Sequence, residues 1–424
     1  MTVIRFVCVN LCAFASLRMR VAPLIAAIAF CTSILSGQTA LSATLSASVP
    51  SPAPVGTIVT WTASGSGSSA GNVRYRFRVR DLADIPRSCH GAQGARIPQD
   101  CASVFSVIRD YGPVATLDWT ASEHEGDYEI EVSARDNDSG AISIATSAFR
   151  FSSRLTDATP VISSTANPLV FLYSAPACPA GSTMRVEFQA PDGSLQSTNS
   201  KSCDGRRSMN FYLAGMQAQT VYSVQHVVQG GAQVQAGSIV LQRTPEASLD
   251  FAARTVAIAP PAGTPNTVIL QARFGWPAAT DALGNLLWYS VQDLSMISRP
   301  EPGGLFLGWF ESETLDAAHQ ILREFDLAGT VLRETNAARV SEQLTAMGMH
   351  AITCFHHEVR GLPDGGILAL AATERILTDV QGPGPVDVIG DTIVVLDRNL
   401  QVQWAWDTFD HLDPYRMATL KETC

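Results

Sequence analysis

The chain has few charged residues, and their balance is acidic. Asp, Glu, Lys and Arg make up 16% of the 424 residues, and the formal net charge is −10 at pH 7. Proteins that follow a phosphate backbone carry clustered Lys and Arg, and this sequence has no basic cluster interleaved with aromatic residues. The composition therefore argues against nucleic acid as a partner.

Long apolar runs are confined to the N-terminus. Residues 21–35 are apolar and follow Arg18 and Arg20, and the small residues at 40–43 offer a cleavage site. We predict a signal peptide over residues 1–43, with an N-terminal extension if translation starts before Met19, and a periplasmic or secreted protein. The run is short for a membrane span, so we expect none after cleavage, and an uncleaved anchor is the alternative.

The cysteines lack the spacing of a metal site. None of them forms a Cys-x-x-Cys motif or has a matching histidine set, so we expect no zinc site at the cysteines. Six cysteines follow the predicted leader, namely Cys89, Cys101, Cys178, Cys203, Cys354 and Cys424. The first two and the next two are local pairs that predict two disulfides, as export would allow, and the last two are left over.

The fold class predicted from the mature chain is all-β. Frequent Gly and Pro separate short runs in which polar and apolar residues alternate, as at residues 57–63, 73–79 and 128–134. We predict an immunoglobulin-like β-sandwich over residues 44–153. Its Tyr128 is placed like the late-strand tyrosine of immunoglobulin-like modules.

A second β-sandwich domain is predicted over residues 154–246. Alternation recurs there at residues 184–188 and 220–224, between turn-rich segments. This domain and the first would together give two immunoglobulin-like or fibronectin-like modules.

A repeat marks the third part of the chain. The segment 281–288 is echoed 45 residues later at 326–333, and a third copy at 397–404 lacks the glycine. This spacing is typical of propeller blades, with each copy forming a hairpin turn. We predict a partial β-propeller over residues 247–424, because this length holds about three or four blades.

Four motifs of this third part resemble one family in their order. They are residues 281–289, 323–336, the His356-His357-Glu358 hairpin and residues 404–413. The chain resembles the bacterial arylsulfate sulfotransferases over about residues 265–424. That resemblance implies a six-bladed propeller and a nucleotide-independent enzyme that uses no metal or cofactor. Its implied partners are an aryl sulfate donor and a phenolic acceptor, which exchange a sulfuryl group through a sulfated histidine.

The resemblance also implies what lies outside the printed sequence. Family members carry a sulfated histidine, an asparagine and an arginine in motifs downstream of the fourth motif, and we expect these beyond Cys424. On this basis the 424-residue chain alone should be nearly inactive.

The predicted catalytic residues are His357 and His356. Adjacent residues of a strand point to opposite faces, so we expect only one of the two in the channel. The family pattern places the histidine before the acidic residue there, which selects His357 for stabilising the sulfuryl group. His356 should act through stability, and Glu358 should point away and orient a neighbour.

Other polar residues near these motifs have ordinary interpretations. We expect Asp410 and His411 in a solvated loop, and Arg360 and Arg375 as solvated strand-edge residues. His319 and His350 have no predicted partner and should be surface or satisfied core histidines. A noncatalytic protein that binds a glycan or another protein with the same modules is the alternative function.

Overall fold

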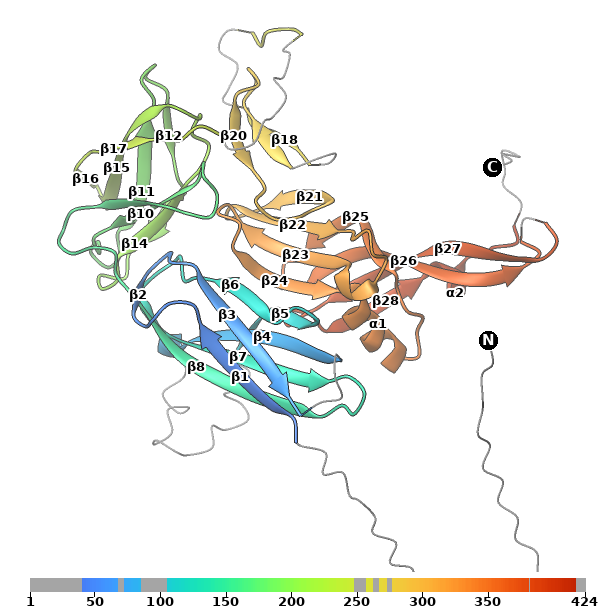
Figure 1. Cartoon of the computed structure of the whole chain (residues 1–424). Coiled ribbons are helices and arrows are strands. Elements are labelled where there is room, and N and C mark those ends of the chain that lie inside the picture. Colours follow the sequence, from blue (N-terminus) through green and yellow to red (C-terminus); the bar gives the residue numbers. More distant parts are fainter. Residues whose placement is uncertain are drawn as a thin grey trace, which may run out of the picture. The chain divides into compact units, whose positions relative to one another are not determined.

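The computed structural model is dominated by β-strands (Figure 1), which confirms the all-β prediction. It describes residues 40–67, 72–84, 105–247, 257–261, 267–272, 277–380 and 382–416. Most of the predicted leader, the predicted Cys89–Cys101 disulfide and Cys424 lie outside these ranges. Within them, no helix is long and apolar enough to cross a membrane.

The first module is a β-sandwich. One sheet has the order β1 (Ser42–Ala47), β3 (Val59–Ser66), β6 (Thr116–Trp119). The other has the order β2 (Ala53–Pro54), β8 (Ile142–Ser152), β7 (Gly126–Asp136), β4 (Val73–Asp81), β5 (Ser106–Gly112), and a 3₁₀ turn at Leu82–Asp84 follows β4. Side chains of both sheets, including Trp61 and Phe149, share one buried core, as alternating apolar residues predict.

Tyr128 has the contact that its position predicts. Its hydroxyl donates to the backbone carbonyl of His124, at 3.1 Å, four residues upstream. A tyrosine that bonds back across a strand corner in this way is a feature of immunoglobulin-like sandwiches. The bond fixes the entry to β7.

The second module is also a sandwich. One sheet has the order β14 (Met209–Leu213), β10 (Phe171–Ala175), β9 (Val161–Ser164). The other contains β12 (Leu195–Ser197), β13 (Lys201–Ser202), β11 (Thr183–Gln189), β15 (Val221–Gly230), β16 (Gln233–Ala236) and β17 (Val240–Arg243).

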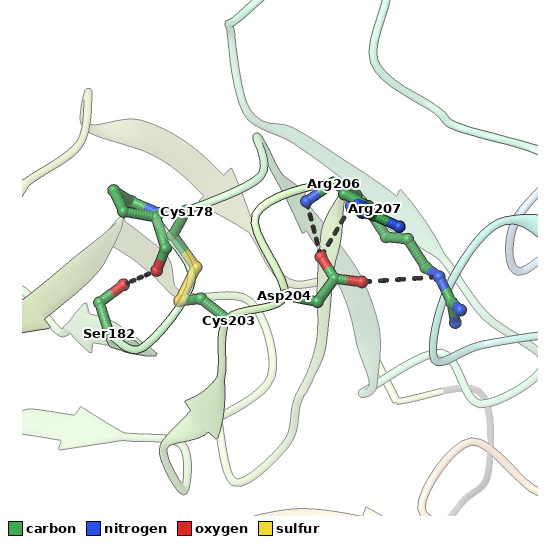
Figure 2. Close-up of a disulfide and its surroundings, with 7 residues drawn as sticks. Cys178, Ser182, Cys203, Asp204, Arg206 and Arg207 are labelled. Atoms are coloured by element: carbon green, nitrogen blue, oxygen red, sulfur yellow. Dashed lines mark hydrogen bonds and ion pairs between the residues drawn. A yellow bond between two sulfur atoms is a disulfide. The ribbon is translucent and has the colours of Figure 1, made fainter.

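The predicted Cys178–Cys203 disulfide is present in this module (Figure 2). It joins the segment after β10 to the segment after β13, and both cysteines are buried in the module's core. Beside it, the Ser182 hydroxyl donates to the Pro179 carbonyl at 2.6 Å, and the Asp204 carboxylate accepts from the backbone N–H of Arg206 at 2.7 Å. The short loops at this end are therefore fixed by both covalent and hydrogen bonds.

Three antiparallel groups of strands form the third part, coloured from yellow to red in Figure 1, and the second group continues the sheet that contains β5 through the parallel pair Arg109–Glu334. The first has β18 (Ile269–Gln271), β19 (Ala278–Thr280) and β20 (Leu286–Tyr289). The second has β21 (Met296–Glu301), β22 (Leu305–Phe310), β23 (Ile321–Asp326) and β24 (Val331–Asn336), with a 3₁₀ turn at Ala317–His319. Helix α1 (Ala337–Ala346) follows, and then come β25 (Cys354–Gly361), β26 (Ile367–Thr378), β27 (Pro385–Leu396), β28 (Val402–Asp407) and the short helix α2 (Thr408–His411).

Consecutive strands of this part pair in chain order, as the predicted blades require. β21 to β24 and β25 to β28 each pair consecutive strands in chain order. The predicted turns of the three repeat copies, at residues 281–285, 326–330 and 397–401, connect paired strands, as does a further turn at 364–366. A closed ring is not shown, and it stays a prediction.

An aspartate fixes each of the three repeated turns. The carboxylate of Asp281 accepts from the backbone N–H of Asn285, at 2.8 Å, and Asp326 and Asp397 make the same contact four residues ahead. The fourth residue of the turn has positive φ, which glycine adopts without strain. Leu400, where the third copy lacks glycine, takes the same conformation with φ 61°.

Removing the disulfide should destabilise the second sandwich. Replacing both Cys178 and Cys203 with alanine should lower its free energy of unfolding by about 3 kcal/mol, because the bridge closes a loop with a sequence separation of 25 residues. Denaturant unfolding with a probe in this module measures the change. Cys354→Ala, which removes a free cysteine, is the control and should not reproduce the loss.

Candidate functional site

The predicted site residues lie on β25, which pairs with β26 and contacts β21. Leu362 to Gly366 form the turn between β25 and β26, where Gly366 N–H donates to the Asp364 carboxylate at 2.9 Å. Side chains of β21 hold the other edge of β25: the Ser298 hydroxyl accepts from Val359 N–H at 3.0 Å, and Glu301 accepts from Gly361 N–H at 3.1 Å. The histidine pair is thus carried by a strand that is fixed on both sides.

Strand β25 is distorted at the histidines. Phe355 pairs with Ala371 and Val359 pairs with Ala369, so three residues of β25 stand opposite the single Leu370. His357 has φ 54°, in the left-handed region that histidine adopts more often than most residues. The distortion is a bulge, which changes the direction in which side chains point.

The bulge overturns the expectation that the two histidines point to opposite faces. Their Nδ1 atoms are 2.8 Å apart, and the rings meet edge to face with centroids 5.0 Å apart. Strand alternation requires a regular register, and the extra residues remove it here. His356 is partly buried and His357 is exposed, so His357 is the ring that a ligand can reach.

His356 has a second partner that the sequence did not reveal. Its Nε2 lies 3.1 Å from Oδ1 of Asp391 on β27. Burial lowers the pKa of His356, and the neighbouring His357 adds to this, while Asp391 acts in the opposite direction. The net pKa is below the usual value, which favours the neutral form of His356.

Glu358 is bonded to a neighbouring sheet, in keeping with its expected orienting role. Its carboxylate forms a hydrogen-bonded ion pair with Arg299 of β21, and Arg360 lies 3.8 Å from the same oxygen. Arg360 is 56% exposed, as a solvated strand-edge residue should be.

Arg375 is not the solvated residue that we expected. Its side chain is 23% exposed, bonds Asp407 at 3.2 Å and Asp410 at 3.0 Å, and lies over the ring of Phe409. Asp407 is buried and also accepts from Phe409 N–H at 2.8 Å, which starts α2. The expected solvated loop at Asp410 and His411 is therefore a helical turn, in which the His411 ring stacks on Trp406.

His350 and His319 also have neighbours that the sequence did not predict. His319 lies 3.2 Å from Asp316, and His350 has a ring nitrogen within 4.8 Å of carboxylate oxygens of Asp407 and Asp410. A histidine with two carboxylates could hold a metal ion in principle. Here Arg375 already balances both carboxylates, so we assign this cluster to an ion-pair network.

The fold and the site define an all-β protein whose third part presents an exposed imidazole from a bulged strand. Residues 253–423 match the family Arylsulfotransferase (ASST). The match confirms, for this part of the chain, the resemblance to the arylsulfotransferase family that the motifs predicted.

Other comparisons add little. No curated protein matches the chain in sequence. Similar solved structures include the chicken CNTN1 FN1-FN3 domains, at 10% identity and TM-score 0.18, covering 49% of this chain and 68% of that one. They also include the chicken interferon gamma receptor alpha chain, at 9% identity and TM-score 0.18, covering 49% and 99%. These scores are too low to carry an argument.

The two arginines should differ sharply in their effect on stability. Arg375→Met leaves the buried Asp407 carboxylate without its cation and should lower the free energy of unfolding by about 2 to 3 kcal/mol. Arg360→Met removes an exposed cation and should change it by less than about 0.5 kcal/mol. Denaturant unfolding of both variants measures the difference, and equal losses would contradict the assigned network.

Proposed function

We propose that this protein is an aryl sulfotransferase that moves a sulfuryl group from an aryl sulfate ester to a phenolic acceptor. The family match of residues 253–423 supports the reaction class. We further propose a propeller as the complete fold and a sulfohistidine intermediate without a nucleotide donor. One observation carries the assignment to a site: the bulge of β25 makes His357 an exposed imidazole beside a second imidazole.

An imidazole is suited to this reaction. Sulfuryl transfer resembles phosphoryl transfer, since a trigonal SO₃ unit passes between partners in line and its three oxygens carry negative charge. A protonated imidazole can donate a hydrogen bond to one of these oxygens, and a neutral one can act as a nucleophile. We assign to His357 the contact with the sulfuryl oxygens, because the neighbouring His356 already faces Asp391.

The backbone of His357 decides which substitution tests this contact. Its φ of 54° strains alanine, whereas asparagine adopts this region more readily. His357→Asn should weaken binding of 4-nitrophenyl sulfate at least about tenfold, because a hydrogen bond to a charged group contributes about 1.5 to 3 kcal/mol. Titration calorimetry measures the affinity.

A matched control separates the site from general effects. His319→Asn removes another exposed histidine of the third part, one that lies beside Asp316, and it should leave binding unchanged. Binding that survives His357→Asn intact would remove the hairpin from the site. Release of 4-nitrophenol in the presence of phenol tests transfer separately, in protein that also carries the downstream family motifs, and there loss of the imidazole should lower turnover about 10²-fold.

We also propose that the protein works outside the cytoplasm. The disulfide between Cys178 and Cys203 and the apolar segment after Arg18 and Arg20 support this location. In the structure, Ser42 and Ala43 pair with Ser66 and Gly65, so a mature chain that keeps all of β1 begins at or before Ser42.

Secretion from the native host should yield a chain that starts between residues 40 and 44. Cleavage near the early part of this range would retain the β1 pairs. N-terminal sequencing of the exported protein measures the start, and an intact leader would contradict the proposal.

A further inference from the structure

The histidine pair and Asp391 form a continuous hydrogen-bonded row. Asp391 Oδ1 lies 3.1 Å from His356 Nε2, and His356 Nδ1 lies 2.8 Å from His357 Nδ1. Asp391 is itself placed by α2, because its backbone N–H donates to the Thr408 hydroxyl at 2.9 Å. The row therefore runs from a fixed strand residue to the exposed ring.

The chemistry of each atom dictates where the protons lie. A carboxylate only accepts hydrogen bonds, so Nε2 of His356 must carry a proton to bond Asp391. A neutral imidazole has one N–H, which leaves Nδ1 of His356 as an acceptor. The short contact between the two Nδ1 atoms then requires the proton on Nδ1 of His357.

We infer that Asp391 is a positioning residue that fixes, through His356, which nitrogen of His357 carries the proton. With both rings neutral, Nε2 of His357 holds a free lone pair and is the atom left for a ligand. When the pair takes up one proton, the same atom becomes an N–H donor, and the Asp391 carboxylate balances the new charge.

The use of this arrangement in binding a sulfate ester rests on the proposed function. The geometry of the row itself is independent of that proposal. A sulfate ester is an anion and would be met by the donor form, with Nε2–H directed at a sulfuryl oxygen. His356 thus contributes by orienting and polarising its neighbour, as a carboxylate does for a histidine in other sites. The lowered pKa of His356 favours a neutral His356 ring before a ligand binds.

The position of the proton is measurable without any activity. In protein labelled at the histidine nitrogens, long-range ¹H–¹⁵N correlation at about pH 8, where imidazoles are neutral, identifies the protonated nitrogen of each ring. The row predicts Nε2–H for His356 and Nδ1–H for His357. A spectrum with His357 protonated at Nε2 would overturn the inference.

Variants of Asp391 test its role in the row. Asp391→Ala removes the acceptor, so the population of His357 protonated at Nε2 should rise. Asp391→Glu keeps a carboxylate, which can only accept, and should retain the original form. Both should fold, because the side chain is 53% exposed and the backbone bond to Thr408 remains. The control is Asp387→Ala, which removes an exposed carboxylate from the same strand.

The outcomes separate this inference from the proposed function. If the Asp391 variants change the protonated nitrogen of His357 as expected but 4-nitrophenyl sulfate does not bind, the inference is supported and the proposed function fails. If the ester binds through His357 and no Asp391 variant changes its protonated nitrogen, the inference is wrong.

Discussion

The bulge in β25 is the constraint on which the candidate site depends. A regular strand would send His356 and His357 to opposite faces, and no contact between their rings could form. Three residues opposite Leu370, together with the positive φ of His357, bring the Nδ1 atoms to 2.8 Å. The bulge thus brings the two imidazole rings into contact, and the regular strands on either side hold the rings in place.

The surrounding sheet holds the bulge in position. Two side chains of β21, Ser298 and Glu301, accept backbone N–H groups of β25 beyond the histidines, and Arg299 binds Glu358 within the bulge. On the other side, Asp391 of β27 faces His356. Contacts from two strands distant in sequence therefore define an arrangement that β25 and β26 alone could not maintain.

Much of the fold follows from local sequence, and the site geometry does not. Turns of the form Asp-x-x-Gly, such as Asp326 to Thr330, predict hairpins because the aspartate carboxylate accepts a hydrogen bond within its own turn. The alternation of polar and apolar residues predicts the sandwich strands. The resemblance to the family motif identifies the histidine hairpin as the candidate site. His356 and Asp391 are 35 positions apart in the sequence, and Arg375 and Asp407 are 32 positions apart. No local sequence pattern therefore reveals either contact. The bulge was not predicted, because the alternation of residues between the two faces assumes an unbroken strand register.

The central claim is that the exposed ring of His357 meets the sulfuryl group. The most direct measurement is a titration of histidine-labelled protein with 4-nitrophenyl sulfate, following the ring resonances of His357 and His319. The account predicts a saturable shift at His357 and none at His319, which lies beside Asp316. Saturable binding of the ester with an unchanged His357 ring would contradict it.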